Sequence, residues 1–569
     1  MNNSDELKMF DVILKNGRVI NGSGNPWFKA DVGIKNGKID AVGNLAREAA
    51  DRVIDTSGLT VTPGFIDPHS HTDFSIIKHK QAISSLQQGI TTEYVGNCGM
   101  SRFFPITDKN QKLALMETAD LLVTDLDKVS LDWADFTGFK KKLDEMGIGV
   151  NLACFVGHNT VRRGVMNEED MGGERPVPTD GELEEMKQLV AKAMEQGCWG
   201  FTTGLVYKPG RNAKTEEVIE LCRVVAGYGG TYMSHIRGYR SLEGLKEFID
   251  IAEKTPIRSV ASHQDIRTYT KNKQLVGPKL EEVQLLFNNA RARGVELYID
   301  ILPWGGYSSS SMVSILLETK DHFDENGKRL TLEQFMDMLR DPEKRKQILD
   351  KARERHEKSR KIREGSEKVT SELGDMNIVN RSIRFPEYVE RSMADIAKMR
   401  GTDYVSAAAD ILLEDEGNTF WGSWHSEGEL KALLKHPAAM PSTDGHVVAM
   451  DEPMIHLGAA PAVRLYASFP KVLGVYVRED HLFPLEEAIR KMTALPAQAI
   501  GLEDRGFIRP GMWADIAVFD PDRIAHTATY FEPRQYCVGI EYVLVNGVLA
   551  MDQGKMTNAL AGKTLIHKL

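Results

Sequence analysis

Short apolar segments alternate with charged, amphipathic segments through the middle of this chain of 569 residues. Such alternation is typical of parallel strands joined by helical crossovers. The apolar segments predict eight strands, near residues 62–67, 91–95, 148–155, 199–203, 230–234, 257–262, 295–301 and 438–443. Eight strand–helix units predict an α/β fold, a (β/α)8 barrel, with its active site at the carboxyl ends of the strands.

The two ends of the chain follow a different pattern. Short alternating segments such as FDVILKNGRVIN near the start and GIEYVLVNGVLAMDQG near the end are separated by Asn-Gly turns, as in β-hairpins. We expect residues 1–61 and 501–569 to pair into one small β-sandwich domain. The catalytic barrel, residues 62–500, would then be inserted between its two halves.

Residues 305 to about 435 interrupt the strand–helix alternation. Within them, residues 344–368 form a dense run of charged side chains with few apolar positions. Two interpretations stay open. The segment could be a solvated helical excursion, or it could be a lid over the barrel mouth, since long insertions at this face are often functional.

Composition excludes several classes of protein. The formal net charge of −10 argues against general binding of nucleic acid. No segment reaches the ~18 apolar residues of a membrane span, and the N-terminus lacks the pattern of a signal peptide. Five scattered cysteines predict reduced thiols and a cytoplasmic protein. Assembly into a homo-oligomer is left open.

The segment GFIDPHSHTD, residues 64–73, is the strongest chemical signal in the chain. It begins as a buried strand and ends in His69 and His71, whose side chains point the same way because they are two residues apart. Imidazole is a common ligand for zinc. Two unrelated surface histidines are the alternative, but further donors after later strands favour a metal site.

Those further donors also stand at predicted strand ends. Cys98 follows one strand, Asp444 follows the last, and His235 and His263 follow neighbouring strands as two Ser-His pairs 28 residues apart. Each has another interpretation when taken alone. Cys98 could be a core thiol or a nucleophile, the histidines could be structural, and Asp444 could be a turn residue. Together the donors predict a catalytic metal site, in which Asp444 could also take a proton from water.

The motifs resemble those of the amidohydrolase superfamily and, more narrowly, the N-acyl-D-amino-acid deacylases, or D-aminoacylases. The resemblance covers nearly the whole chain outside residues 310–435. It is carried by GFIDPHSHTD, GITTEYVGNCG, VGHNTVR, TTGLVYKPG, SHIR, FPKVLGVYVRE, EEAIRKMTALPAQAIGLEDRG, WADIAVFDP and STDG. It implies a zinc-dependent enzyme that cleaves the amide of a small N-acylated amino acid into a carboxylate and an amine.

The resemblance also implies roles for individual residues. The tight zinc site would consist of Cys98, His235 and His263. A second, weaker or vacant metal position would consist of His69, His71 and Asp444, with Asp444 as the general base. A substrate carboxylate would be held by Tyr207 and Arg464, and Ser308 or Ser309 would line the same pocket.

The chain departs from this family at two places near the predicted pocket. The family often has His-Lys after the third zinc ligand, where this chain has Gln264 and Asp265. This chain also has Gly238-Tyr239 where the family usually has Asp-Glu. The lysine would help to hold the substrate carboxylate, which an aspartate would repel. Either Asp265 turns away from the pocket and forms a salt bridge with Arg237 or Arg267, or the substrate differs from that of the family.

Two other functions remain open at this level. A cyclic-amide hydrolase of the hydantoinase or dihydroorotase kind would need a carboxylated lysine on the fourth strand, yet GCWGFTTGLV contains none and Lys208 falls in the following loop. A barrel that serves as a non-catalytic scaffold would be free to lose metal ligands, whereas every candidate position is filled here.

Overall fold

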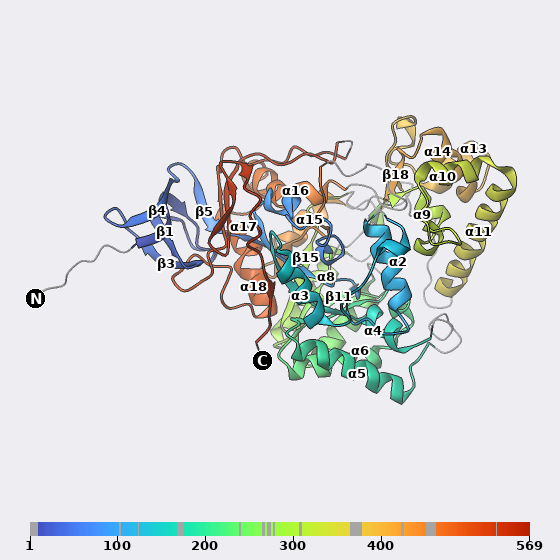
Figure 1. The fold of residues 1–569 in the computed structure, drawn as a ribbon, viewed down its shortest axis with the longest axis horizontal. Helices are drawn as coiled ribbons and strands as arrows, with labels where there is room; N and C mark the ends of the chain where they lie inside the picture. Colours follow the sequence, from blue (N-terminus) through green and yellow to red (C-terminus); the bar gives the residue numbers. More distant parts are fainter. Residues whose placement is uncertain are drawn as a thin grey trace, which may run out of the picture.

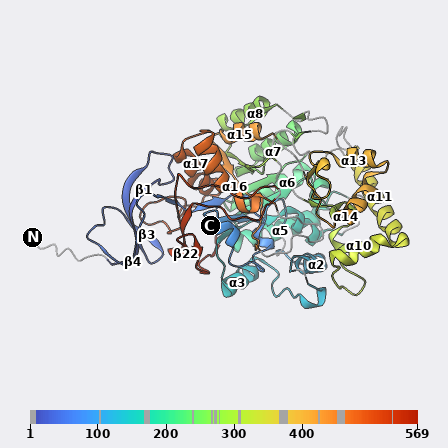
Figure 2. The same cartoon turned by 90° about the horizontal axis from the view of Figure 1, so that it is seen from above.

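A computed structural model describes most of the chain in three adjoining parts. Its described residues are 9–101, 104–122, 124–167, 176–237, 241–264, 268–269, 275–276, 279–305, 310–364, 378–422, 426–450, 462–530 and 532–568. A barrel occupies the centre, with the sheet of the chain ends on one side and a helical insertion on the opposite side (Figures 1 and 2).

The central part is built from parallel strands that are almost entirely buried. They are β6 (Phe65–Asp67), β7 (Ile90–Val95), β8 (Asn151–Cys154) with β9 (Val156–Gly157), β10 (Gly200–Gly204), β11 (Thr231–His235), β12 (Arg258–Ala261), β15 (Leu297–Ile301) and β19 (Ala439–Pro441). They pair in the orders β6-β7-β8 and β9-β10-β11-β12-β15-β19. A parallel bridge between Ser70 and Gly445 joins the first strand to the last. Burial on both faces explains why these strands read as continuous apolar runs.

Helices surround the barrel strands. They are α1 (Ile83–Leu86), α2 (Gln111–Leu122), α3 (Phe136–Met146), α4 (His158–Val165), α5 (Asp180–Glu195), α6 (Thr215–Gly227), α7 (Leu242–Lys254), α8 (Leu280–Ala292), α15 (Glu427–Leu434), α16 (Arg464–Lys471), α17 (Leu485–Met492) and α18 (Ala494–Ile500). Helix α5 shows how the sequence encodes them: Thr179 and Glu182 form a capping box at its start, and Met186 and Val190 face the core. None of the helices in the described part of the chain is long and apolar enough to span a membrane.

Both ends of the chain contribute to one nine-stranded sheet. Its strands are β1 (Met9–Val19), β2 (Phe28–Lys35), β3 (Lys38–Gly43), β4 (Ala49–Asp55), β5 (Thr60–Pro63), β20 (Ile516–Phe519), β21 (Ile540–Val545), β22 (Val548–Asp552) and β23 (Lys555–Met556). The two halves meet where β20 pairs antiparallel with β5. Asn546 and Gly547 both have positive φ, as the predicted hairpin turn requires. The expected fold class, a barrel with a β domain from both ends and a helical insertion, is confirmed. The expected β-sandwich is a single nine-stranded sheet in the structure.

The end of the chain then returns to the barrel. Strand β24 (Thr564–Leu565) pairs parallel with β8, so the C-terminal segment serves both parts. The Trp199 indole N–H donates to the carbonyl of Leu565 at 3.0 Å. The boundaries at residues 61 and 501 stay predictions.

The insertion has an apolar core of its own. It contains α9 (Val313–Leu316), α10 (Leu332–Arg340), α11 (Pro342–Glu364), α13 (Met393–Arg400), α14 (Tyr404–Glu414) and a small antiparallel sheet, β16 (Ser310–Ser311), β18 (Phe420–Gly422) and β17 (Ile378–Arg381). Phe335, Ile396 and Leu412 are among the side chains buried in its core. Helix α15, which we expected inside the insertion, instead packs its leucines into the barrel core.

The described part of the charge run, residues 344–364, lies in helix α11, which forms ion pairs with the rest of the insertion. Arg345 pairs with Asp410 at 2.6 Å, and Arg353 pairs with Asp403 at 2.8 Å. The insertion also contacts the segment that follows β7, where the Leu126 N–H donates to the carbonyl of Gly327 at 3.1 Å. The segment is therefore more than a solvated excursion, and its action as a lid stays a prediction.

Candidate metal centre and active site

The six predicted metal-site residues all lie at the carboxyl ends of barrel strands. They are His69 and His71 after β6, Cys98 after β7, His235 at the end of β11, His263 after β12 and Asp444 after β19. The barrel therefore gathers side chains that are up to 375 positions apart at one rim, as the sequence predicts.

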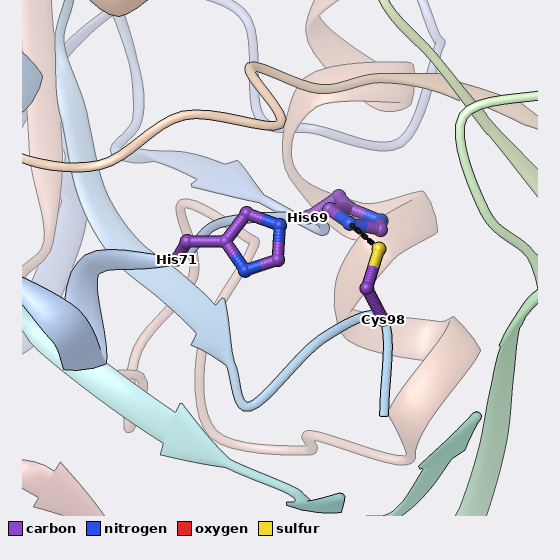
Figure 3. A group of neighbouring side chains, drawn as sticks. All are labelled: His69, His71 and Cys98. Atoms are coloured by element: carbon purple, nitrogen blue, oxygen red, sulfur yellow. Dashed lines mark hydrogen bonds between the residues drawn. The ribbon is translucent and has the colours of Figure 1, made fainter. Parts of the chain in front are cut away.

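Cys98 is the centre of the gathered donors. Its Sγ lies 3.4 Å from His263 Nε2, 3.5 Å from His69 Nε2 and 3.7 Å from His235 Nδ1. Figure 3 shows His69 and Cys98 facing each other, with His71 beside them. Two groups have all their ligand atoms within 4.8 Å of one another: His69, His71 and Cys98, and Cys98, His235 and His263. Cys98 is common to both.

Asp444 is in contact with His69 and His71. Its Oδ1 is 3.1 Å from His71 Nε2 and 3.6 Å from His69 Nε2, while its Oδ2 is 3.3 Å from the guanidinium of Arg464. The carboxylate therefore links the metal-ligand candidates to a predicted substrate-binding cation.

Cys98 and His235 have the protonation that suits a metal ion, whereas Cys98 and nearby carboxylates raise the pKa of His69, His71 and His263 against the effect of burial, so a metal would replace a proton on those three rings. Burial alone would raise the pKa of the Cys98 thiol, but the neighbouring His263 and His69 hold that pKa well below its usual range. Burial lowers the pKa of His235 to about 4, which leaves that imidazole neutral. Thiolate and neutral imidazole are the forms that bind zinc and similar ions. The donor set therefore fits a metal.

Three of the six residues have a backbone conformation that residues other than glycine rarely adopt. Cys98 has φ of 54°, His263 of 33° and Asp444 of 43°. Non-glycine residues in this left-handed region are uncommon and cluster at functional sites. Each of the three lies two or three residues after the end of a barrel strand, where the chain bends and directs a donor toward the centre.

The structure describes two of the predicted substrate-binding residues, Tyr207 and Arg464. The Tyr207 ring lies 4.9 Å from the His235 ring and 40% of the residue is exposed, so it stands at the edge of the centre. Arg464 opens α16 beside Asp444. Asp265, Ser308 and Ser309 lie outside the described residues, as do Gly238 and Tyr239. Arg237, one candidate partner for Asp265, pairs with Glu247 at 2.9 Å.

Sequence reasoning missed two groups of buried polar residues beside the site. Asp300 lies within apolar strand β15 and contacts His69. The second group surrounds Glu217, whose carboxylate lies 2.7 Å from His158 and 2.9 Å from Arg162. The guanidinium of Arg162 also donates to the carbonyl of Pro209, two residues after Tyr207, at 2.9 Å. An acidic residue in the middle of an apolar strand is the signal that could have found Asp300.

A buried cluster of thiol, imidazole and carboxylate at the mouth of a (β/α)8 barrel is typical of a metal-dependent hydrolase. Residues 52–550 match the model of the amidohydrolase family. The chain therefore belongs to that family, and it is a hydrolase of carbon–nitrogen bonds in linear amides.

Particular relatives match over nearly the full length. N-acyl-D-glutamate deacylase of Alcaligenes xylosoxydans xylosoxydans is 32% identical over 95% of this chain and 94% of its own. D-aminoacylase of the same organism is 30% identical over 99% of both chains. A structure of N-acyl-D-glutamate deacylase from Bordetella bronchiseptica, complexed with zinc and a phosphonate inhibitor, has a TM-score of 0.71 and 30% identity over 98% of this chain and 100% of that one.

Hydantoinase structures are similar to this chain in fold. A D-hydantoinase structure has a TM-score of 0.52 at 16% identity, over 98% of this chain and 99% of that one. The fourth barrel strand, β10, contains no lysine, and Lys208 lies beyond its end at Gly204. The residues of the fourth strand thus give no support to a carboxylated-lysine centre.

Proposed function

We propose that this enzyme removes the acyl group from an N-acyl-D-amino acid with the help of zinc. The tight zinc would be held by Cys98, His235 and His263, and a second, weaker position by His69, His71 and Asp444. The observation that carries the proposal is the position of the Cys98 sulfur, within 3.7 Å of three imidazole nitrogens. The full-length similarity to two D-amino-acid deacylases supports the substrate class.

Asp444 would act as the general base and then as the general acid. Zinc, when bound, polarises the amide carbonyl and lowers the pKa of a water from about 15.7 to near 7. Burial alone would raise the pKa of Asp444, but Arg464 and His71 hold it well below its usual range, so Asp444 is a carboxylate at neutral pH. It would accept a proton from the attacking water and later give that proton to the leaving amine. The products would be a carboxylate and a free amino acid.

Arg464 and Tyr207 would orient the substrate through its carboxylate. A guanidinium can form two parallel hydrogen bonds with a carboxylate, which gives direction as well as energy. In the structure Arg464 pairs with Asp444, so substrate and general base would share one cation at the site. This sharing would bring the scissile amide near the base.

The direct test is metal-dependent deacylation. Purified enzyme is dialysed against a chelator and supplied again with zinc, and the release of free amine is followed from N-acetyl-D-amino acids, their L-enantiomers and a hydantoin. We expect hydrolysis of D-substrates that disappears with the metal and returns with zinc. Preferential opening of the hydantoin, with dependence on bicarbonate, would support the cyclic-amide alternative instead.

Replacement of Arg464 is expected to weaken substrate binding. Arg464→Ala should cost about 2–5 kcal/mol of binding, because it removes a partly buried partner of a carboxylate. Arg464→Lys keeps the charge but loses the planar fork, so it should also raise KM. KM and kcat measured separately test the role, with Arg523→Ala, a change at an arginine whose side chain is 67% exposed, as the control. Unchanged kinetics in both Arg464 variants would place the carboxylate elsewhere.

Asp265 is expected to shift the substrate preference. It stands two residues after His263, where an aspartate would repel a substrate carboxylate. The unmodified enzyme should therefore be weak on N-acetyl-D-methionine and N-acetyl-D-leucine and better on substrates with a neutral or cationic group at that position. Asp265→Lys should raise activity on the simple substrates, whereas Asp522→Lys, an exposed control with the same change of charge, should not. Efficient hydrolysis by the unmodified enzyme would favour a salt bridge for Asp265.

A further inference from the structure

Asp300 is a buried carboxylate that connects three strand ends of the metal centre. Its Oδ1 accepts the His263 backbone N–H at 2.8 Å and the Ser442 hydroxyl at 2.9 Å. Its Oδ2 lies 3.2 Å from Nδ1 of His69. The residue is fully buried in β15. A carboxylate is costly in such a place unless its oxygens are satisfied, so these three contacts explain why it is tolerated there.

We infer that Asp300 is a positioning residue that fixes the tautomer of His69 for the second metal position. Because a carboxylate only accepts hydrogen bonds, Nδ1 of His69 must carry a proton, and Nε2 is the nitrogen whose lone pair would bind a metal. That Nε2 faces Cys98 Sγ at 3.5 Å and Asp444 Oδ1 at 3.6 Å. Ligand histidines are commonly oriented by such a carboxylate on the opposite ring nitrogen. This inference rests on the proposed metal-dependent function.

The two oxygens of Asp300 have separate tasks. Oδ1 already accepts from His263 and Ser442, so only Oδ2 serves His69. In Asp300→Asn the remaining oxygen can keep the contacts of Oδ1, and the amide NH2 then faces His69. Nδ1 would have to accept, and the proton would move to Nε2, the atom that faces the proposed metal position. The substitution thus changes a tautomer with almost no change in shape.

The expected effect is confined to one of the two metal positions. His69 belongs to the proposed weaker position, with His71 and Asp444, whereas the tight position uses Cys98, His235 and His263. Asp300→Asn should therefore weaken binding of the second zinc by about 10–100-fold. The first zinc should stay stoichiometric, because the His263 backbone contact is retained.

The test is a zinc titration of the metal-free full-length protein in competition with a chromophoric chelator. Unmodified protein, Asp300→Asn and Ser442→Ala are compared, and circular dichroism confirms their folding. Ser442→Ala is the matched control, because it removes a donor to Oδ1 and leaves the pair of Asp300 and His69 intact. It should bind both zinc ions as the unmodified protein does.

Each result decides the inference. A weaker second zinc in Asp300→Asn alone, with an unchanged first zinc, supports it. Unchanged binding of both ions overturns it and leaves the proposed function standing. Loss of the first zinc as well, or an equal loss in Ser442→Ala, would show that Asp300 maintains the whole rim and not one tautomer. Unmodified protein with a single zinc also overturns the inference, and protein with none overturns the proposed function too.

Discussion

Replacement of Cys98 by alanine is expected to strip the tight metal from the protein and abolish hydrolysis while the barrel stays folded. Cys98 Sγ belongs to both groups of candidate ligands, so its loss removes a donor from each. The neighbouring histidines hold its pKa well below the usual range, which makes it a thiolate, the strongest zinc ligand in the cluster. Metal content per chain and amide hydrolysis are the measurements.

A second cysteine provides the control for this experiment. Cys222 is buried in α6, and burial raises the pKa of its thiol, which is therefore neutral and a poor ligand. Cys222→Ala should keep both metal and activity, so a loss in Cys98→Ala alone would assign the metal to that position. Circular dichroism and thermal unfolding separate loss of metal from loss of fold. Cys98→Ala with a stoichiometric metal ion and normal turnover would refute the assignment.

The strands and the donors after them were predictable because one physical rule fixes both. Strands buried on two faces are mostly apolar, so the polar residue that follows each run marks the carboxyl rim. His235 and His263 illustrate this, since both follow apolar runs and their rings lie 4.2 Å apart in the barrel. The gathering of the donors thus followed from the order of strands alone, whereas their roles are still predictions.

Other features could not be predicted, because they depend on contacts between residues far apart in the sequence. Strand β18 pairs with β16, which lies more than a hundred residues earlier in the chain, so the small sheet of the insertion was not visible in the sequence. The pairing of Arg464 with Asp444 likewise joins a helix start to a strand end. Asp300 was missed for a related reason: its role appears only when His69, His263 and Ser442 surround it.

Asp444→Asn is expected to lower the catalytic rate by roughly 100-fold or more while the tight zinc stays bound. The amide has nearly the same shape as the carboxylate, yet it cannot accept a proton at neutral pH. Asp444 is a carboxylate there, because Arg464 and the nearby histidines hold its pKa well below its usual range against the effect of burial. The tight ligands Cys98, His235 and His263 are unchanged by the substitution, so the metal should remain.

The measurement is kcat together with metal content, and the split between them identifies the role of Asp444. A general base affects turnover at constant zinc, whereas an essential ligand would lose the tight metal together with activity. Asp31→Asn makes the same chemical change at a buried carboxylate in β2, where Asp31 accepts backbone N–H groups of Asn16 and Leu45, and it should leave kcat unaltered. Near-normal turnover in Asp444→Asn would exclude Asp444 as the base and would require another group to take the proton from water. His71, whose Nε2 lies 3.1 Å from the same carboxylate, would be the next residue to test.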